Sequence, residues 1–394
     1  MALPQSQPKP VLIVSGGPVT QPLWSALGEK YDLCFLQPQP SQLAAELGLP
    51  AFCIPQLVDE NIREKSNNRM AILTAAFVAQ MPAVAARLTS FLPPTHPPAL
   101  NSQFNEWFAG YIAQHFSWQA QYIGVLDLVA SQRKIAGCLV HEDVGPDTRL
   151  AVLWSRAHDL PTLHLPHANC HLHPGVRDIH RETRTDWILA HGDYMREFYT
   201  ESGFDPERIV TVGNPAADAL YGPLPTKAEA RSVMADRTWG DASKSLWLCY
   251  ATTWGQTTSL RSGFEKEFEQ GCAAVIKLAK DMGAILEIIV HRSSDPAVEK
   301  FFSDQMRTAG VPGLVTRQHF NYVVRAADAM IAQGPSNMCI EAAIMGVPSC
   351  YIRTEGFDYA HALPYRGAPE DLSGMVFHAL TTQGDWQDFI AYYN

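Results

Sequence analysis

The chain lacks paired cysteines, long apolar runs and an excess of positive charge. Its eight cysteines are scattered through apolar contexts with no Cys-x-x-Cys pair, which is the pattern of a reduced, cytoplasmic protein. No run approaches the roughly 18 to 20 apolar residues of a membrane span, and residues 1–10 lack the basic and apolar regions of a secretion signal. The formal net charge of -10 argues against non-specific binding of nucleic acid, which needs a basic face.

A dinucleotide-binding fingerprint is also missing. The apolar run 11–14 ends in Ser15-Gly16-Gly17-Pro18, which does not have the Gly-x-Gly-x-x-Gly spacing. We therefore expect no dinucleotide cofactor. We predict that Gly16 and Gly17 instead let an acceptor or a donor sugar approach the backbone.

What the chain does contain is an alternation of short apolar runs and helical patterns over 394 residues, too many for one ordinary core. The alternation pauses at the linker candidate 222–225. We predict an N-terminal domain over residues 1–222, a C-terminal domain over 223–375 and a C-terminal helix over 376–394. Two helix-period blocks within residues 58–134 form an insertion in the first domain. The expected strands are 11–14, 33–36, 137–140, 162–165, 186–190, 208–212, 246–250, 285–290, a strand near 314, and 329–332.

The most informative pattern lies in the second domain. A buried strand (329–332) leads into a tight turn at Gly334, and a helix opens at Ser336 or Asn337. Because a helix N-terminus presents unpaired N–H groups and a partial positive charge, this turn predicts a phosphate site. Glu341, one turn further in, is expected to accept hydrogen bonds from ribose hydroxyls. Ser336 and Asn337 would cap the helix with or without a ligand.

Two other strand ends of this domain carry candidate donor-binding residues. His291 and Arg292 follow one strand, and the arginine could bind a phosphate through two parallel hydrogen bonds. Thr252 and Thr253 follow the first strand of the domain and are further candidates for phosphate contacts. The alternative for each is a structural, hydrogen-bonded residue at the end of a strand.

The candidate catalytic residues lie in the first domain. Glu142 and Asp143 follow the strand 137–140, and His167 follows the next one. A hydroxyl group that attacks an activated carbon needs a carboxylate or imidazole to take its proton. Asp143 is the favoured base, with Glu142 and His167 as alternatives. The competing interpretation is that these acids cap the helix that begins near Thr148.

Two further patterns are weighed. His167 and His171 have a spacing used by zinc ligands, but Pro166 and Pro174 break regular geometry there. We therefore predict a histidine-rich substrate loop and no metal. Asp358, in the segment after the last main strand, is predicted to line the sugar side of the donor site.

Three loop phrases together carry a resemblance to a known superfamily. They are Pro-Thr-Leu-His-Leu-Pro-His within residues 159–168, Val-Gly-Asn-Pro within 208–218, and the turn and helix of 327–348. In this order they resemble the GT-B glycosyltransferase superfamily. The nearest likeness is to UDP-N-acetylglucosamine 2-epimerases and to CDP-glycerol or polysaccharide-building transferases. The resemblance implies that Gly213 and Asn214 belong to the donor-binding junction.

The resemblance covers about residues 137–350. It implies an α/β protein of GT-B architecture: two Rossmann-like, doubly wound parallel-sheet lobes facing a cleft, with the helical insertion in the first lobe. The activity it implies is an inverting, metal-independent glycosyltransferase, with UDP the first guess for the donor nucleotide. The alternatives are an NDP-sugar 2-epimerase of the same fold and a non-catalytic nucleotide-sugar-binding protein. The acceptor stays open among a glycan, a lipid-linked sugar and a modified nucleobase, and so does a homodimer.

Overall fold

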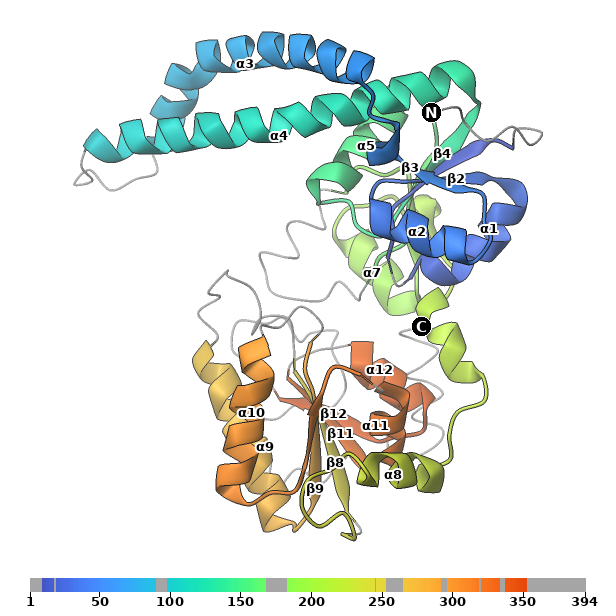
Figure 1. Ribbon diagram of the computed structural model, residues 1–394, viewed down its shortest axis with the longest axis vertical. Helices are drawn as coiled ribbons and strands as arrows, with labels where there is room; N and C mark the ends of the chain where they lie inside the picture. The colour runs from blue at the N-terminus through green and yellow to red at the C-terminus, as the bar shows by residue number, and fades with distance from the viewer. Residues whose placement is uncertain are drawn as a thin grey trace. The chain divides into compact units, whose positions relative to one another are not determined.

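The computed structural model shows two parallel β-sheets, each flanked by helices (Figure 1). It describes residues 9–17, 19–89, 98–167, 183–244, 246–252, 265–291, 296–318, 320–333 and 337–352. Among these, one compact unit holds the residues up to Leu165 together with Arg184–Trp187, and a second unit holds the remainder. The domain boundary expected at residue 222 stays a prediction, and the expected C-terminal helix lies outside the described residues.

The first sheet is doubly wound, as expected. Its seven strands lie in the order β3-β2-β1-β4-β5-β6-β7, so the chain adds strands on one side of β1 and then on the other. The pairs β3–β2, β2–β1, β1–β4, β4–β5 and β6–β7 are parallel. The strands are β1 (Val11–Val14), β2 (Asp32–Phe35), β3 (Ala51–Cys53), β4 (Ile135–Val140), β5 (Thr162–His164), β6 (Trp187–Ala190) and β7 (Ile209–Thr211).

Strand β1 shows why these runs are uniformly apolar. All four of its residues are buried, because both faces of the sheet are covered. Val11 and Ile13 pack into one core, whereas Leu12 and Val14 pack into another with Trp24. The connecting helices are α1 (Trp24–Lys30), α2 (Pro38–Glu46), α5 (Pro146–Ala157) and α7 (Asp193–Glu201), with the 3-10 helices η1 (Gln21–Leu23), η2 (Ile54–Leu57) and η3 (Pro206–Arg208).

The expected helical insertion is confirmed. Helices α3 (Glu60–Thr89) and α4 (Pro98–Gln132) follow β3 and precede β4 in the chain, and they lie side by side (Figure 1). The end of α4 is anchored by Arg133, whose guanidinium lies 2.6 Å from the carboxylate of Asp32 in a nearly fully buried ion pair. None of the helices in the described ranges combines the length and the hydropathy needed to cross a membrane.

The second sheet repeats the doubly wound plan with five strands in the order β10-β9-β8-β11-β12, all of its pairs parallel. The strands are β8 (Trp247–Ala251), β9 (Ile285–Ile289), β10 (Gly313–Thr316), β11 (Ala329–Gln333) and β12 (Ser349–Ile352). The helices are η4 (Pro215–Tyr221), α8 (Lys227–Ala235), α9 (Glu265–Asp281), α10 (Pro296–Ala309), α11 (Phe320–Ala326) and α12 (Asn337–Ile344).

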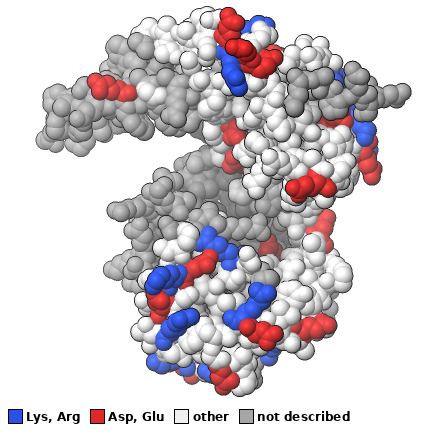
Figure 2. Space-filling model, viewed as in Figure 1, with Lys and Arg blue, Asp and Glu red and all other residues white. Residues whose placement is uncertain are grey.

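Charged side chains are mixed in sign on the described surface of the second unit. Figure 2 shows acidic and basic residues interspersed there, with no broad basic face in this view. This distribution agrees with the composition, which argues against a non-specific grip on nucleic acid.

Candidate functional site

Two topological switch points, one in each sheet, position many of the predicted site residues. In a doubly wound parallel sheet, ligands bind beyond the carboxyl ends of neighbouring strands whose connections leave in opposite directions. These strands are β1 and β4 in the first sheet, and β8 and β11 in the second. Residues 15–17 and 141–143 follow the first pair, whereas Thr252 and helix α12 follow the second.

At the first switch point, Ser15 and His141 join the two loops. The Ser15 hydroxyl oxygen lies 2.7 Å from the ring Nδ1 of His141 and accepts the backbone N–H of the same residue at 2.7 Å. A hydrogen bond at Nδ1 fixes the orientation of an imidazole. The sequence did not single out this pair, which is separated by 126 positions.

The glycines of this loop are required by close packing. A Cβ atom at Gly17 would lie 2.8 Å from Cγ of the His141 ring, and one at Gly16 would lie 2.0 Å from Cγ of Pro40. The glycines therefore let side chains of the protein itself approach the backbone. The predicted contact of Gly16 and Gly17 with a sugar stays a prediction.

Asp143 is a buried carboxylate with several partners. Its residue surface is 1% exposed, and its Oδ2 accepts the backbone N–H groups of Arg184 and Thr185, the latter at 3.1 Å. Its Oδ1 lies 3.0 Å from Nε of Arg149 on α5. Burial raises the pKa of Asp143, and the Arg184 N–H and the Arg149 charge partly oppose that rise. Asp143 thus ties the loop after β4 to the segment before β6, and its role as a base stays a prediction.

The alternative interpretation, that a loop acid caps the following helix, stays a prediction. Helix α5 begins at Pro146, and its N-cap residue is Gly145, which has no side chain that could cap it. The carboxylate of Glu142 lies near this helix start. Its Oε1 would be only 2.3 Å from a Cβ atom placed on Gly145. A carboxylate near a helix N-terminus is stabilised by the positive end of the helix dipole. Glu142 is half-buried, so it is more accessible than Asp143.

Histidines gather where β5 and β6 end. His167 is exposed, and the predicted partner His171 lies outside the described residues. His191, which follows β6, was missed by the sequence analysis, although its position directly after a strand is a readable signal. It is 1% exposed, and its Nε2 has no hydrogen-bond partner among the described residues. Burial lowers the pKa of His191 to about 4, and a hydrogen bond with the Pro166 backbone partly opposes that effect.

Beside the second switch point, Thr252 after β8 and His291 after β9 are joined. The backbone N–H of His291 donates to the Thr252 hydroxyl oxygen at 3.0 Å, and Thr252 is 4% exposed. The hydroxyl therefore links the carboxyl ends of β8 and β9. The His291 residue itself is exposed. Phosphate contacts by these two residues stay predictions.

Strand β11 ends at Gln333, and helix α12 begins at Asn337. Glu341 lies one turn inside the helix and is half-buried. The other end of α12 is fixed by Arg325, whose Nη1 donates to the carbonyl oxygen of Met345 at 2.5 Å. A cation at this end complements the helix dipole. The start of the helix is thus presented at the sheet edge where the sequence predicts a phosphate.

The Gly213-Asn214 junction has a local structural explanation. Gly213 has a φ of 83°, a left-handed conformation that favours glycine. The Asn214 side chain accepts the backbone N–H of Ala216 at 3.0 Å and so caps η4. Because η4 contacts α12, the junction lies beside the helix of the predicted donor turn. Direct donor contacts by these residues stay predictions.

Several predicted site residues fall outside the described ranges, namely Arg292, Thr253, Gly334, Ser336 and Asp358. Within the described part of the chain, no group of three or more His, Cys, Asp or Glu side chains is arranged to hold a metal ion. The prediction of a metal-independent site stays a prediction.

Solved structures share this fold at low sequence identity, whereas no protein-family model and no curated protein sequence matches. The UDP-GlcNAc 2-epimerase from Neisseria meningitidis bound to UDP-GlcNAc is 14% identical with a TM-score of 0.50, over 96% of this chain and 90% of that one. The UDP-GlcNAc 2-epimerase from Methanocaldococcus jannaschii is 11% identical with a TM-score of 0.53, over 95% and 93%. Anabaena Alr3699/HepE in complex with UDP is 10% identical with a TM-score of 0.57, over 97% and 94%.

In each case the structural similarity extends over nearly the whole of both chains and is not limited to one of the two sheets. At these identities it shows the fold alone. The expected GT-B class, with a doubly wound parallel sheet in each half and a helical insertion in the first, is confirmed.

Proposed function

We propose that the protein binds a nucleoside diphosphate sugar at the carboxyl ends of β8 and β11 and inverts the configuration at C2 of the sugar. The observation that carries the proposal is the start of α12 at this switch point, with Glu341 one turn inside. UDP is the favoured nucleotide, because the similar structures include complexes with UDP and with UDP-GlcNAc. The 2-epimerases among them favour this reaction over glycosyl transfer.

The nucleotide would be held by backbone N–H groups and by two side chains. The first backbone N–H groups of α12 would meet the diphosphate, which carries the negative charge that a helix N-terminus favours. Glu341 would accept hydrogen bonds from the ribose hydroxyls, since a carboxylate is an acceptor only. Exposed His291, whose backbone is linked to Thr252 at 3.0 Å, would donate to a phosphate oxygen.

Inversion at C2 requires a proton to leave one face of the carbon and return to the other. Its loss is made feasible by departure of the diphosphate: the C–H electron pair forms a C1=C2 double bond while the C1–O bond breaks and its electrons go to UDP. Re-addition of UDP at C1 and of a proton on the opposite face of C2 completes the reaction without net oxidation. A positioned base must take the C2 proton.

Four residues are candidates for that base and for the acid that delivers a proton to the opposite face of C2. Glu142 and His167 are preferred over Asp143, because Asp143 is 1% exposed and bound to backbone N–H groups. His141 joins them, since its Nδ1 is held 2.7 Å from the Ser15 hydroxyl. The test compares three single variants: Glu142→Gln, His141→Asn and His167→Asn. The variant that loses turnover but keeps its nucleotide affinity identifies the residue that transfers the proton.

The test of the reaction is proton exchange at C2. We expect UDP-GlcNAc incubated in D2O with the protein and no acceptor to yield a second UDP-sugar, with deuterium at C2, visible by NMR. The rate should be unchanged by EDTA if the site is metal-independent. A nucleotide sugar that keeps its C2 proton while UDP still binds would overturn the epimerase assignment.

The test of the nucleotide site is binding itself. UDP should raise the melting temperature more than CDP, GDP or dTDP do. Glu341→Gln should weaken UDP binding by about tenfold, the value of one hydrogen bond to a charged group. Glu207→Gln, an exposed glutamate on η3, is the matched control and should bind UDP as the wild type does. If no nucleotide stabilises the protein, the donor site is wrong.

An inverting glycosyltransferase is the second candidate. The insertion α3–α4 favours it, because an epimerase needs no acceptor and this hairpin supplies additional binding surface. A transferase would release UDP only when an acceptor hydroxyl is added, and it would leave C2 unlabelled in D2O. A protein that binds UDP and does neither would be a nucleotide-sugar-binding protein.

A further inference from the structure

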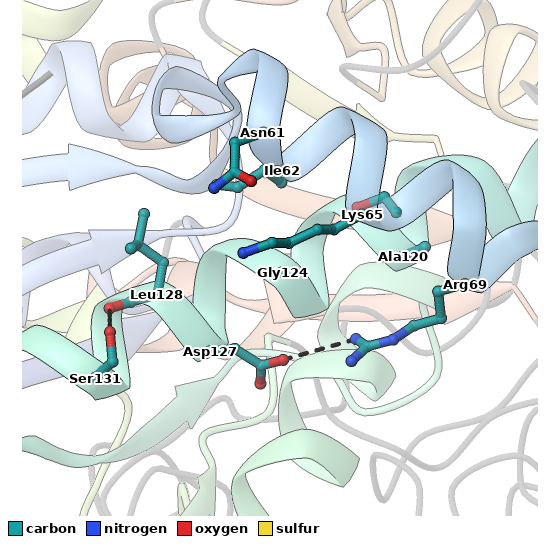
Figure 3. Close-up of a pocket in the computed structure, with 10 residues that line it drawn as sticks. Asn61, Ile62, Lys65, Arg69, Ala120, Gly124, Asp127, Leu128 and Ser131 are labelled. Atoms are coloured by element: carbon teal, nitrogen blue, oxygen red, sulfur yellow. Dashed lines mark hydrogen bonds and ion pairs between the residues drawn. The ribbon is translucent and has the colours of Figure 1, made fainter.

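A cavity of about 440 Å³ lies between α3 and α4. None of its lining residues belongs to the strand-end loops of the two switch points. Figure 3 shows Lys65 and Arg69 on α3 directed toward the face of α4 that carries Gly124 and Asp127. Its volume is within the range of about 300–1,000 Å³ that is typical of small-molecule sites. The lining residues are Asn61, Ile62, Lys65, Ser66, Arg69, Ala120, Gly124, Asp127, Leu128 and Ser131.

We propose that this cavity binds a phosphate ester through Lys65 and Arg69. The two cations are four residues apart on α3, so they lie on one face of the helix, one turn from each other. Asn61 continues the same row a turn earlier and adds an amide donor. Two cations and an amide donor that line one cavity suit a phosphate ester, because its oxygens accept several charge-assisted hydrogen bonds.

The cations are only partly neutralised by the protein. Arg69 Nη1 lies 3.6 Å from Oδ2 of Asp127, which is longer than a hydrogen bond, and both side chains are about half exposed. No ion pair or hydrogen bond of Lys65 is found with any residue that the structure describes. The lining thus carries two positive charges and one negative charge. This local excess of positive charge favours an anion, although the whole chain has a formal net charge of -10.

The floor of the cavity is apolar and tightly built. Ile62 and Ala120 are 5% and 2% exposed, and Ser66 is 4% exposed beside them. A Cβ at Gly124 would lie 3.1 Å from Cγ2 of Ile62 and 3.5 Å from the Ser66 hydroxyl oxygen. Gly124 therefore lets the helices approach while keeping the floor open. An apolar floor below a charged rim suits a ligand with a carbon skeleton and one phosphate group.

Removing the charge of Asp127 should strengthen phosphate binding, whereas removing the cations should weaken it. The Oδ1 of Asp127 accepts the indole N–H of Trp154 at 2.9 Å, whereas its Oδ2 faces Arg69. Asp127→Asn keeps an oxygen acceptor for Trp154 and removes the negative charge that competes with an anionic ligand. The substitution should therefore strengthen phosphate binding without disturbing the packing of α4 on α5.

The experiment measures binding of defined phosphates to the full chain by calorimetry, with UDP present at saturation so that the proposed nucleotide site is filled. The probes are glucose 1-phosphate, inorganic phosphate, and vesicles of phosphatidylcholine with and without phosphatidic acid. We expect binding of glucose 1-phosphate or of the phosphatidic acid vesicles, weakened about tenfold or more in Lys65→Ala/Arg69→Ala and strengthened several-fold in Asp127→Asn. The soluble and the vesicle arms distinguish a free phosphate ester from a lipid headgroup.

The outcomes are separable from those of the proposed function. Both variants should keep the wild-type melting temperature to within a few degrees and should bind UDP unchanged. Binding of every probe equally by wild type and by Lys65→Ala/Arg69→Ala would overturn the assignment of the cavity, and so would the absence of any binding. Either result would leave the nucleotide site of the second sheet unaffected.

Discussion

At the scale of single residues, Glu287 is a buried acid inside a strand. It lies in the middle of β9 with 0% exposure, and neither carboxylate oxygen has a hydrogen-bond partner among the described residues. Burial raises the pKa of Glu287 well above its ordinary value of 4.5, with only a partial opposing effect from the charge of Arg231. The carboxyl is therefore protonated in the folded protein at pH values where the unfolded chain has lost the proton.

Replacing Glu287 by Gln should stabilise the protein increasingly as the pH rises above 4.5. An acid whose folded pKa is raised contributes full stability below its unfolded pKa and loses it as the pH rises toward the folded pKa. Urea unfolding at pH 5 and at pH 8 should show the advantage of the variant growing by at least about 1 kcal/mol. An advantage that is the same at both pH values would mean that Glu287 does not titrate as proposed.

His191 has the opposite pH dependence. Its pKa is lowered from the ordinary value of 6.5 to about 4, mainly by burial. The unfolded chain takes up a proton as the pH falls below 6.5 while the folded protein does not, so stability is lost between pH 6.5 and 4. His191→Asn should remove up to roughly 3 kcal/mol of this acid sensitivity. Melting curves of both proteins at pH 7 and pH 5 check it, and parallel shifts would refute it.

At the scale of elements, Asp143 links the loop after β4 to the segment before β6. Asp143→Asn puts an amide or a neutral oxygen against two backbone N–H groups and removes the charge that pairs with Arg149. We expect a loss of about 2–4 kcal/mol in the free energy of unfolding, because a buried acceptor network is broken. A variant as stable as the wild type but inactive would instead support a purely catalytic Asp143.

The β1 loop makes a second prediction at this scale. Gly17→Ala brings a methyl group to 2.8 Å from the His141 ring, so the ring must leave its position beside the Ser15 hydroxyl. We expect a loss of roughly 1–3 kcal/mol in stability from overpacking, with reduced turnover and unchanged UDP affinity. Gly110→Ala in α4 is the matched control, since nothing lies within 4 Å of its Cβ. Equal stability of the two variants would contradict the close contact.

At the scale of the whole molecule, UDP should protect one sheet selectively. A ligand at one hundred times its Kd adds about 2.7 kcal/mol to the stability of the state that binds it. Hydrogen exchange should therefore slow in β8, β9, β11 and α12, while β2 and β3 keep their rates. Uniform protection of both sheets, or protection of β2 and β3 alone, would move the nucleotide site elsewhere.

Much of the fold could be predicted from apolar runs and strand-end loops. The insertion expected within residues 58–134 is present as α3 and α4, and the expected strand 285–290 matches β9 (Ile285–Ile289). Strand β3 (Ala51–Cys53) was missed, because three residues are too short to show a period. The start of α5 was expected near Thr148 but lies at Pro146, because Gly145 forms the N-terminal boundary without a side-chain cap.

The candidate site was predictable only where its signal is local. Local residue patterns are enough to predict the alternation of strands and helices and the polar loops at strand ends, since burial on both faces of a parallel sheet needs uninterrupted apolar runs. The placement of β1 beside β4, and of β8 beside β11, follows from tertiary structure alone, because strand pairing joins segments far apart in the chain. The same pairing brought Ser15 to His141 and buried Asp143, and helix packing opened the cavity beside Lys65. These contacts depend on distances between elements, which no local period of residues encodes.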